Sequence, residues 1–138
     1  MKRLWCMGLG DVLLVLHVLG IVGWAGLTTG AYFVLREWRP REVPKSYQRL
    51  VHLEAAAGAL VFATGVAMAV YLYGFPKSPL WIHWALGIAI VVGLLEVFHV
   101  YAVRRWPLER YVRLANRLVP VWAAVLVLML WLMVAKPF

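Results

Sequence analysis

The chain has 138 residues, 64% of them hydrophobic, a mean hydropathy of +0.82 and a formal net charge of +8. This much apolar surface exceeds what a soluble domain of that length needs, and indicates a membrane protein whose outer face is solvated by lipid. The positive charge could suggest nucleic-acid binding, but the basic residues lie close to apolar segments and no nucleic-acid-binding module fits between them. We expect their partners to be membrane lipids, with no nucleic acid.

Four segments are apolar over the roughly 20 residues that a helix needs to cross a bilayer. They are residues 11–35, 50–73, 80–103 and 118–135. Only short connections remain, so we expect one transmembrane domain over residues 1–138. The predicted fold class is all-α: a four-helix, up-and-down transmembrane bundle.

The basic residues are concentrated in two of the connections. Residues 36–49 and residues 104–117 each contain five of the 14 Lys and Arg residues, which leaves four for the rest of the chain. By the positive-inside rule, these two connections are cytoplasmic and both termini lie outside, in a prokaryotic-type cell membrane.

The first segment carries His17, an ionisable residue well inside the apolar run. Gly20 follows it by three residues and lies on the same face of the helix. Gly26 and Gly30 form a GxxxG pair, which is typical of close helix packing, a homodimer included, and which would also let a flat ligand approach.

The second segment places His52 and Glu54 near its cytoplasmic end. Two residues turn an α-helix by about 200°, so these two side chains point in nearly opposite directions. Three alanines follow on the face of His52, and they predict either tight packing or the wall of a slot: Ala56, Ala59 and Ala63.

The third segment carries His83, with Gly87 one turn later, and then Glu96 and His99, which share a face because they are three residues apart. The fourth segment has no ionisable side chain. Its Pro120 is expected in the first helical turn, where a missing N–H costs little.

The four histidines fall into two pairs at matched heights, because successive helices run in opposite directions. His17 and His83 lie toward the outer surface, and His52 and His99 lie toward the inner one. Neutral imidazole is the less costly form in a membrane, and it is also the form that ligates iron, copper or zinc. We therefore predict one or two haem b groups per chain, with the four histidines as candidate axial ligands. Gly20 and Gly87, which follow the two outer histidines, would line the macrocycle. The alternative is that the histidines bond only to headgroups, water or backbone carbonyls.

Two other metal sites fit parts of the sequence. Glu96 and His99 form an ExxH motif, which di-iron carboxylate proteins carry twice with two further carboxylates, whereas here only Glu54 is available. Otherwise the two glutamates would relay protons or hold an arginine from a cytoplasmic connection. Copper is a rival cofactor, because soft sulfur ligands lie on the same side as the outer histidines. These are Cys6, Met7, Met68, Met129 and Met133.

The stretch LLVLHVLGIVGWAGLTTGAYFVL resembles the first helix of the CopD/HemJ-like membrane proteins, with His17 and Trp24 on the matching positions. The stretch WIHWALGIAIVV resembles the HemJ pattern W-x-H-x-K-L, and its matching residues are Trp81, His83 and Leu86. The resemblance covers two of the four helices and implies haem-binding protoporphyrinogen oxidases on the HemJ side and copper handling on the CopD side. It implies a haem-linked role for His17 and then for His83. Ala85 replaces the lysine of the pattern, which argues against the oxidase activity.

We therefore expect a b-type haem protein with a redox role, which passes electrons between a quinol or protein donor and an acceptor. The alternatives are a HemJ-like protoporphyrinogen oxidase, a CopD-like copper permeation protein, and an accessory subunit of a larger membrane complex. No stripe of polar residues runs through any segment, which counts against a transporter that acts alone.

Overall fold

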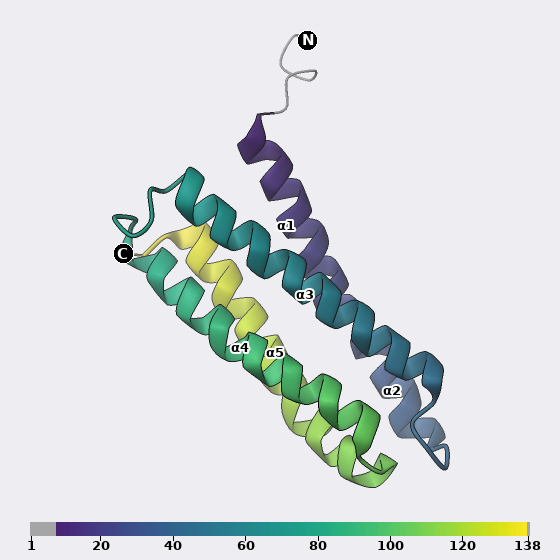
Figure 1. Ribbon diagram of the computed structural model, residues 1–138. Coiled ribbons are helices and arrows are strands. Elements are labelled where there is room, and N and C mark those ends of the chain that lie inside the picture. Colours follow the sequence, from purple (N-terminus) through teal and green to yellow (C-terminus); the bar gives the residue numbers. More distant parts are fainter. Residues whose placement is uncertain (1–7, 138) are drawn as a thin grey trace.

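The computed structural model describes residues 8–137, and all regular secondary structure in this range is α-helical (Figure 1). The helices are α1 (Leu9–Gly26), α2 (Thr29–Trp38), α3 (Lys45–Tyr71), α4 (Leu80–Arg105) and α5 (Leu108–Ala135). Helices α1 and α2 together form one span, so the described residues contain four spans long and apolar enough to cross a membrane. The all-α class and the four spans are thereby confirmed.

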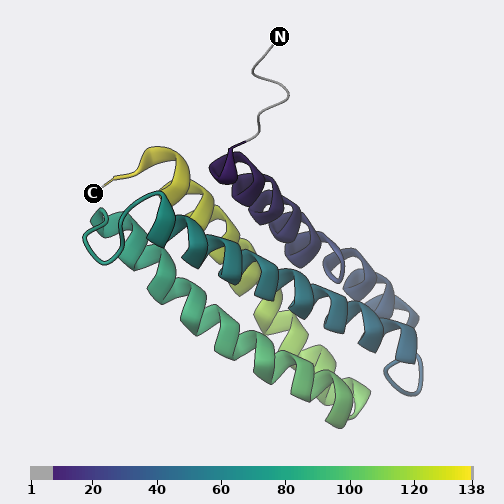
Figure 2. The ribbon, with the colours of Figure 1, turned by 45° about the horizontal axis from the view of Figure 1, so that its top comes forward.

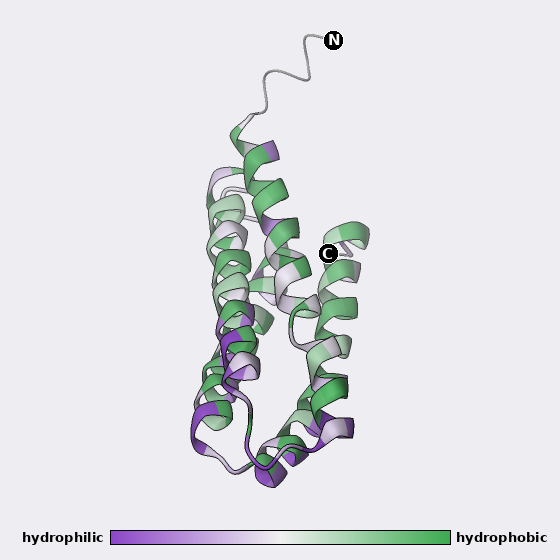
Figure 3. Cartoon of the chain, turned by 90° about the vertical axis from the view of Figure 1, so that its right-hand side faces the viewer, coloured by the Kyte–Doolittle hydropathy of each residue, from purple (hydrophilic) through white to green (hydrophobic). Residues whose placement is uncertain are grey.

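Successive spans run up and down, and the two ends of the described chain lie at the same end of the bundle (Figures 1 and 2). We call this the terminal end. The α2–α3 connection and the α4–α5 connection lie at the opposite end, where hydrophilic residues gather (Figure 3). We call it the basic end, because the Lys and Arg residues of these two connections and of the helix ends beside them lie there.

The first span is interrupted where the sequence predicted a continuous helix over residues 11–35. Helix α1 ends at Gly26 and α2 begins at Thr29. Two threonines explain the break, because their hydroxyl groups form hydrogen bonds that compete with those of a regular helix. Thr29 Oγ1 donates to the carbonyl of Ala25 at 2.7 Å, and the Thr28 hydroxyl donates to Glu54 on α3.

The two basic connections are much shorter than predicted. Most of residues 36–49 and 104–117 is helical, because α3 begins at Lys45 and only residues 106–107 separate α4 from α5. The first part of α5 buries residues at helical spacing, namely Tyr111, Ala115 and Leu118. This periodicity favours a helix in spite of the charges around it.

The position predicted for Pro120 is wrong for the same reason. Helix α5 begins at Leu108, after Pro107, so Pro120 lies well inside the helix and not in its first turn. Pro107 takes the place before the first helical turn, where proline is well tolerated.

Two apolar clusters hold the bundle together, one at each end. The cluster at the basic end joins α2, α3, α4 and α5 through Tyr32, Leu35, Val43, Tyr47, Val51, Ala102, Val103, Tyr111 and Ala115. The cluster at the terminal end is smaller and joins α3, α4 and α5 through Ala69, Trp81, Ile82 and Leu132.

Helix α1 is absent from both clusters and packs on α3 through its glycines. A Cβ added to Gly20 would lie 2.8 Å from Val61 Cγ2 and 3.1 Å from the Ala57 carbonyl oxygen, so α3 occupies the space beside Gly20. Gly26 and Gly30 have no other atom within 4 Å of an added Cβ. The GxxxG pair therefore faces outward and does not pack within the chain.

Candidate metal site

Three buried ionisable residues meet in the half of the bundle nearer the basic end. Glu54 on α3 is 0% exposed, and Glu96 and His99 on α4 are 7% and 4% exposed. The predicted shared face of Glu96 and His99 is confirmed, since His99 Nδ1 lies 3.5 Å from Glu96 Oε1. One ligand atom from each of the three residues lies within 4.8 Å of the others. This geometry is compact enough for a single cation.

Glu54 is held in place from the first span and from α5. The Thr28 hydroxyl donates to Glu54 Oε2, and the Trp122 Nε1–H donates to Glu54 Oε1 at 3.2 Å. Each carboxylate oxygen keeps a further lone pair after accepting one hydrogen bond. These hydrogen bonds therefore fix the orientation of the Glu54 carboxylate and leave lone pairs with which it can ligate a metal ion.

Glu96 and His99, by contrast, carry buried polar atoms without partners. Neither carboxylate oxygen of Glu96 has a hydrogen-bond partner, and neither does His99 Nδ1. Buried polar groups are normally satisfied, so three such atoms in one place point to a bound species. Within residues 8–137, no Lys or Arg pairs with Glu54 or Glu96, so the interpretation in which these glutamates hold an arginine gains no support.

The other nitrogen of His99 is anchored. His99 Nε2 lies 2.7 Å from the Tyr111 hydroxyl, and that hydroxyl lies 2.9 Å from the hydroxyl of Tyr47. The rings of His99 and Tyr111 are nearly parallel, with an interplanar angle of 11° and 5.7 Å between centroids. The imidazole therefore has one nitrogen tied to α5 and the other turned toward the two carboxylates.

A cavity of about 20 Å³ lies beside these groups. It is lined by Thr28, Tyr47, Glu54, His99, Tyr111 and Trp122, among others. A volume of this size holds about one water molecule. It has room for one small ion or one water molecule and is far too small for a porphyrin.

His17 lies between α1 and α3, far along the chain from this site. Its Nδ1 lies 2.9 Å from Thr64 Oγ1, and its Cε1 lies 3.3 Å from a Cβ added to Gly65. The Thr64 hydroxyl also lies 2.7 Å from the Leu60 carbonyl, and its donation to that carbonyl would leave His17 to donate from Nδ1. Its Nε2 then carries the lone pair, which is the tautomer that binds a metal.

The other two histidines lie near the ends of the bundle. His83 Nε2 is 3.3 Å from Ser78 Oγ, and its ring lies 5.0 Å from that of Phe75. His52 is exposed, and its Nδ1 lies 2.5 Å from the Gln48 carbonyl oxygen. The alanines on the same face are exposed as well, so they form neither a packed seam nor a slot within the described chain: Ala56, Ala59 and Ala63.

The predicted pairing of the histidines stays a prediction. Among the described residues, no hydrogen bond or ring contact joins one histidine to another. Gly87 is exposed, with nothing within 4 Å of an added Cβ. Haem ligation by these residues, with Gly20 and Gly87 beside the macrocycle, stays a prediction without a slot in the chain to support it.

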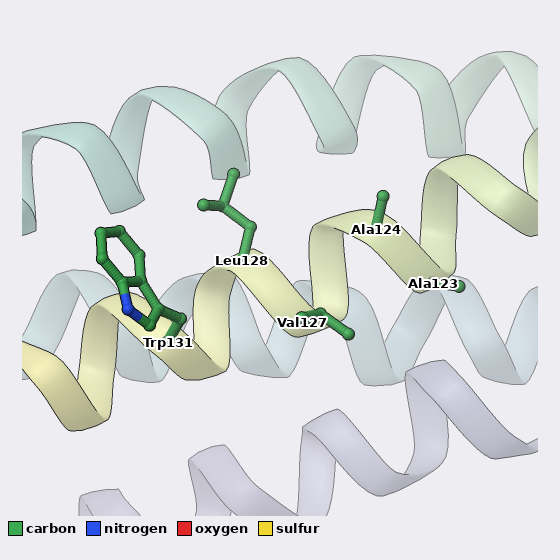
Figure 4. Close-up of a pocket in the computed structure, with 5 residues that line it drawn as sticks. All are labelled: Ala123, Ala124, Val127, Leu128 and Trp131. Atoms are coloured by element: carbon green, nitrogen blue, oxygen red, sulfur yellow. The ribbon is translucent and has the colours of Figure 1, made fainter.

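An open apolar groove lies along α5. It has a volume of about 530 Å³ and is lined by Ala123, Ala124, Val127, Leu128 and Trp131 (Figure 4). None of these residues is a metal ligand. Of the sulfur atoms considered for copper, those of Met129 and Met133 belong to residues packed against the terminal apolar cluster. Cys6 and Met7 lie outside the described residues.

Comparison of the chain with known protein families, with curated proteins and with solved structures finds no match. The resemblance to the CopD/HemJ-like proteins therefore stays a hypothesis, which rests on the two stretches of sequence that carry it.

The sequence placed Glu96 and His99 on one face and offered Glu54 only as a further carboxylate, and it missed the residues that hold all three. Tyr47 and Tyr111 fall in stretches predicted to be connections, and Thr28 falls in a stretch predicted to be continuous helix. The one available signal was the spacing of Tyr111, Ala115 and Leu118, which indicates a buried helical face.

Proposed function

We propose that the chain is an integral membrane metalloprotein in which Glu54, Glu96 and His99 bind one divalent first-row transition-metal ion. The observation that carries the proposal is the set of unpartnered atoms, two on Glu96 and one on His99, turned toward the Glu54 carboxylate. No other cluster of three such ligands occurs in residues 8–137.

Charge supports a cation at this position. If both carboxylates ionised in this low-dielectric interior, they would repel each other, and no Lys or Arg within residues 8–137 pairs with either. A divalent cation offsets both charges at once, while the neutral imidazole adds a third ligand. Two carboxylates and one imidazole suit iron, manganese and zinc better than copper(I), which prefers sulfur.

Iron(II) is the ion we expect, because three protein ligands leave coordination positions open for exchange and iron supplies one-electron chemistry. The residues of this chain would hold and orient it: Glu54 through its bonds to Thr28 and Trp122, His99 through its bond to Tyr111. The redox partner would be a quinol or another membrane protein, as the sequence predicted.

Metal analysis of the purified protein tests the proposal. Protein in mild detergent should contain about one equivalent of iron or manganese, or take it up after reconstitution. Glu96→Gln and His99→Gln should lose most of it. The matched controls Glu109→Gln and His52→Gln change exposed residues and should retain it. A wild-type protein that takes up no iron, manganese or zinc would refute the site.

Haem b at His17 is a second candidate, and the tautomer of His17 favours it. The Thr64 hydroxyl holds Nδ1, which leaves Nε2 available as an axial ligand. A slot for the macrocycle would have to be completed by a second copy or another subunit, since α3 fills the space beside Gly20. A Soret band that disappears in His17→Ala would establish this alternative, and a colourless preparation would exclude it.

We further propose that the basic end faces the cytoplasm and that both termini lie outside. The support is the concentration of Lys and Arg beside the two connections at that end. Single cysteines at Glu42 and Ser78, in a background with Cys6 replaced by serine, distinguish the two orientations. A membrane-impermeant thiol reagent added to whole cells should label position 78 and leave position 42 unlabelled.

A further inference from the structure

Two buried tyrosines lie behind His99 and contact the proposed metal site through His99 Nε2. Tyr111 and Tyr47 are buried, at 0% and 5% exposure, and their hydroxyls form a chain that ends on His99 Nε2. Their rings also meet edge to face, with 5.7 Å between centroids. Because the Tyr111 hydroxyl lies within hydrogen-bond distance of both His99 Nε2 and the Tyr47 hydroxyl, the protons of this chain have few arrangements.

Binding of an ion selects one of these arrangements. A ligating Nδ1 must present its lone pair, which places the ring proton of the neutral imidazole on Nε2. The Nε2–H then donates to the Tyr111 oxygen, and the Tyr111 hydroxyl donates to the Tyr47 oxygen. In the opposite tautomer, Tyr111 donates to Nε2 and the Nδ1–H points at Glu96, where His99 cannot serve as a ligand.

We propose that Tyr111, supported by Tyr47, is the positioning residue that makes His99 an Nδ1 ligand. The inference rests on the metal site proposed above and deepens it. Metal-bound histidines almost always donate their other N–H to an acceptor, and loss of that acceptor typically weakens metal binding about 10- to 100-fold. Here the acceptor is the phenolic oxygen of Tyr111.

The phenylalanine variants test this role, because they remove a hydroxyl and keep the ring. Cobalt(II), whose absorption spectrum reports its ligands, is titrated into metal-free protein. Tyr111→Phe should raise the Kd about 10- to 100-fold. Tyr47→Phe should raise it by less, because Tyr111 still accepts from His99. Tyr73→Phe is the control, since Tyr73 lies at the terminal end against Trp81 and should bind as the wild type does.

A second readout separates positioning from mere packing. Nitrogen-15 spectra of the histidine rings in folded, metal-free protein report which nitrogen carries the proton, and His99→Gln identifies the His99 signals. Tyr111→Phe should shift the His99 proton to Nδ1, where it faces Glu96. A variant that is only less stable would keep the wild-type tautomer.

The failures are distinguishable. If the wild type binds no cobalt, the metal site itself is wrong. If the wild type binds cobalt and Tyr111→Phe binds it equally well with an unchanged spectrum, the positioning role is wrong and the site stands. Should Tyr111→Phe not fold, an unaltered Kd in Tyr47→Phe together with an unaltered His99 tautomer would overturn the role of the tyrosine chain.

Discussion

The two ends of the bundle are built in different ways. Near the basic end, α2, α3, α4 and α5 meet around buried tyrosines and small residues, with Glu54, Glu96 and His99 enclosed beside them. Toward the terminal end, α1 packs on α3, a small cluster joins α3, α4 and α5, and α5 presents an open groove. Glu54, Glu96 and His99 thus lie beside the larger of the two clusters, whereas the buried pair of His17 and Thr64 lies between α1 and α3.

This difference follows from the solvent. In lipid, apolar side chains gain little by leaving the surface, so helix association depends on close packing and on interhelical hydrogen bonds. The basic end supplies both, through residues such as Ala102 and through bonds such as that from Trp122 to Glu54. An ionisable group in a membrane is costly unless neighbouring helices enclose it, which explains why the candidate site lies at this end.

The largest effect is expected from removing the buried ring at the centre of the basic end. Tyr111→Ala should lower the free energy of unfolding by about 3–5 kcal/mol, as truncation of a buried aromatic ring does. Tyr101→Ala, which removes an exposed ring from α4, is the control and should change little. Unfolding of the two variants in mixed micelles measures the difference. Equal losses would show that the Tyr111 ring is not enclosed by the cluster at the basic end.

The second prediction is that one substitution at the site stabilises the metal-free protein and removes metal binding. In metal-free protein, Glu96→Leu should raise the free energy of unfolding by about 1–4 kcal/mol, because it replaces a buried carboxyl group without hydrogen-bond partners by apolar volume. The same variant should lose the metal. The comparison requires unfolding curves for wild type and variant in a chelator, with Glu109→Leu as the exposed control. A large loss of stability in Glu96→Leu would indicate that Glu96 has a structural partner.

The sequence predicted the spans correctly and the site in part, and both outcomes have physical reasons. Long apolar runs are read directly from composition, since a bilayer imposes their length. Glu96 and His99 could be placed on one face because helical spacing is local. Glu54 could not be assigned to them in advance, because the register between α3 and α4 depends on packing that the sequence of either helix does not specify.

The predicted helix boundaries are wrong where the charge of a stretch suggests a connection and its periodicity indicates a helix. The stretch from Leu108 to Leu118 is rich in Arg, which suggested a connection, but its buried positions recur at helical spacing. Amphipathic turns at a membrane edge bury one face and expose the other, so composition alone misassigns them. The pairing of histidines by height stays a prediction, because equal depth in the membrane does not require side chains to face one another.

A smaller effect is expected from the seam between α1 and α3. Gly20→Ala should destabilise the protein by about 1–3 kcal/mol, since the added methyl group meets Val61 and the Ala57 carbonyl at close range. Gly87→Ala adds the same group to an open face of α4 and should be neutral or slightly stabilising, because alanine is the better helix former. Thermal unfolding of the two variants measures the difference in stability. A neutral Gly20→Ala would show that the space beside Gly20 is available to a ligand.

The smallest effect is expected in the apolar groove of α5. Val127 is 67% exposed within the chain, whereas Leu132, one and a half turns further on, is 2% exposed and packs against Ile82 and Trp81. Val127→Ala should change the free energy of unfolding by less than about 0.5 kcal/mol, because lipid replaces the contacts that the side chain loses. Leu132→Ala should cost about 2–5 kcal/mol. Val127→Ala could instead prove as costly as Leu132→Ala in a bilayer while remaining neutral in dilute detergent. In that case another helix would have to cover the groove in the membrane. The loose packing of the terminal end would then be a property of the isolated chain alone.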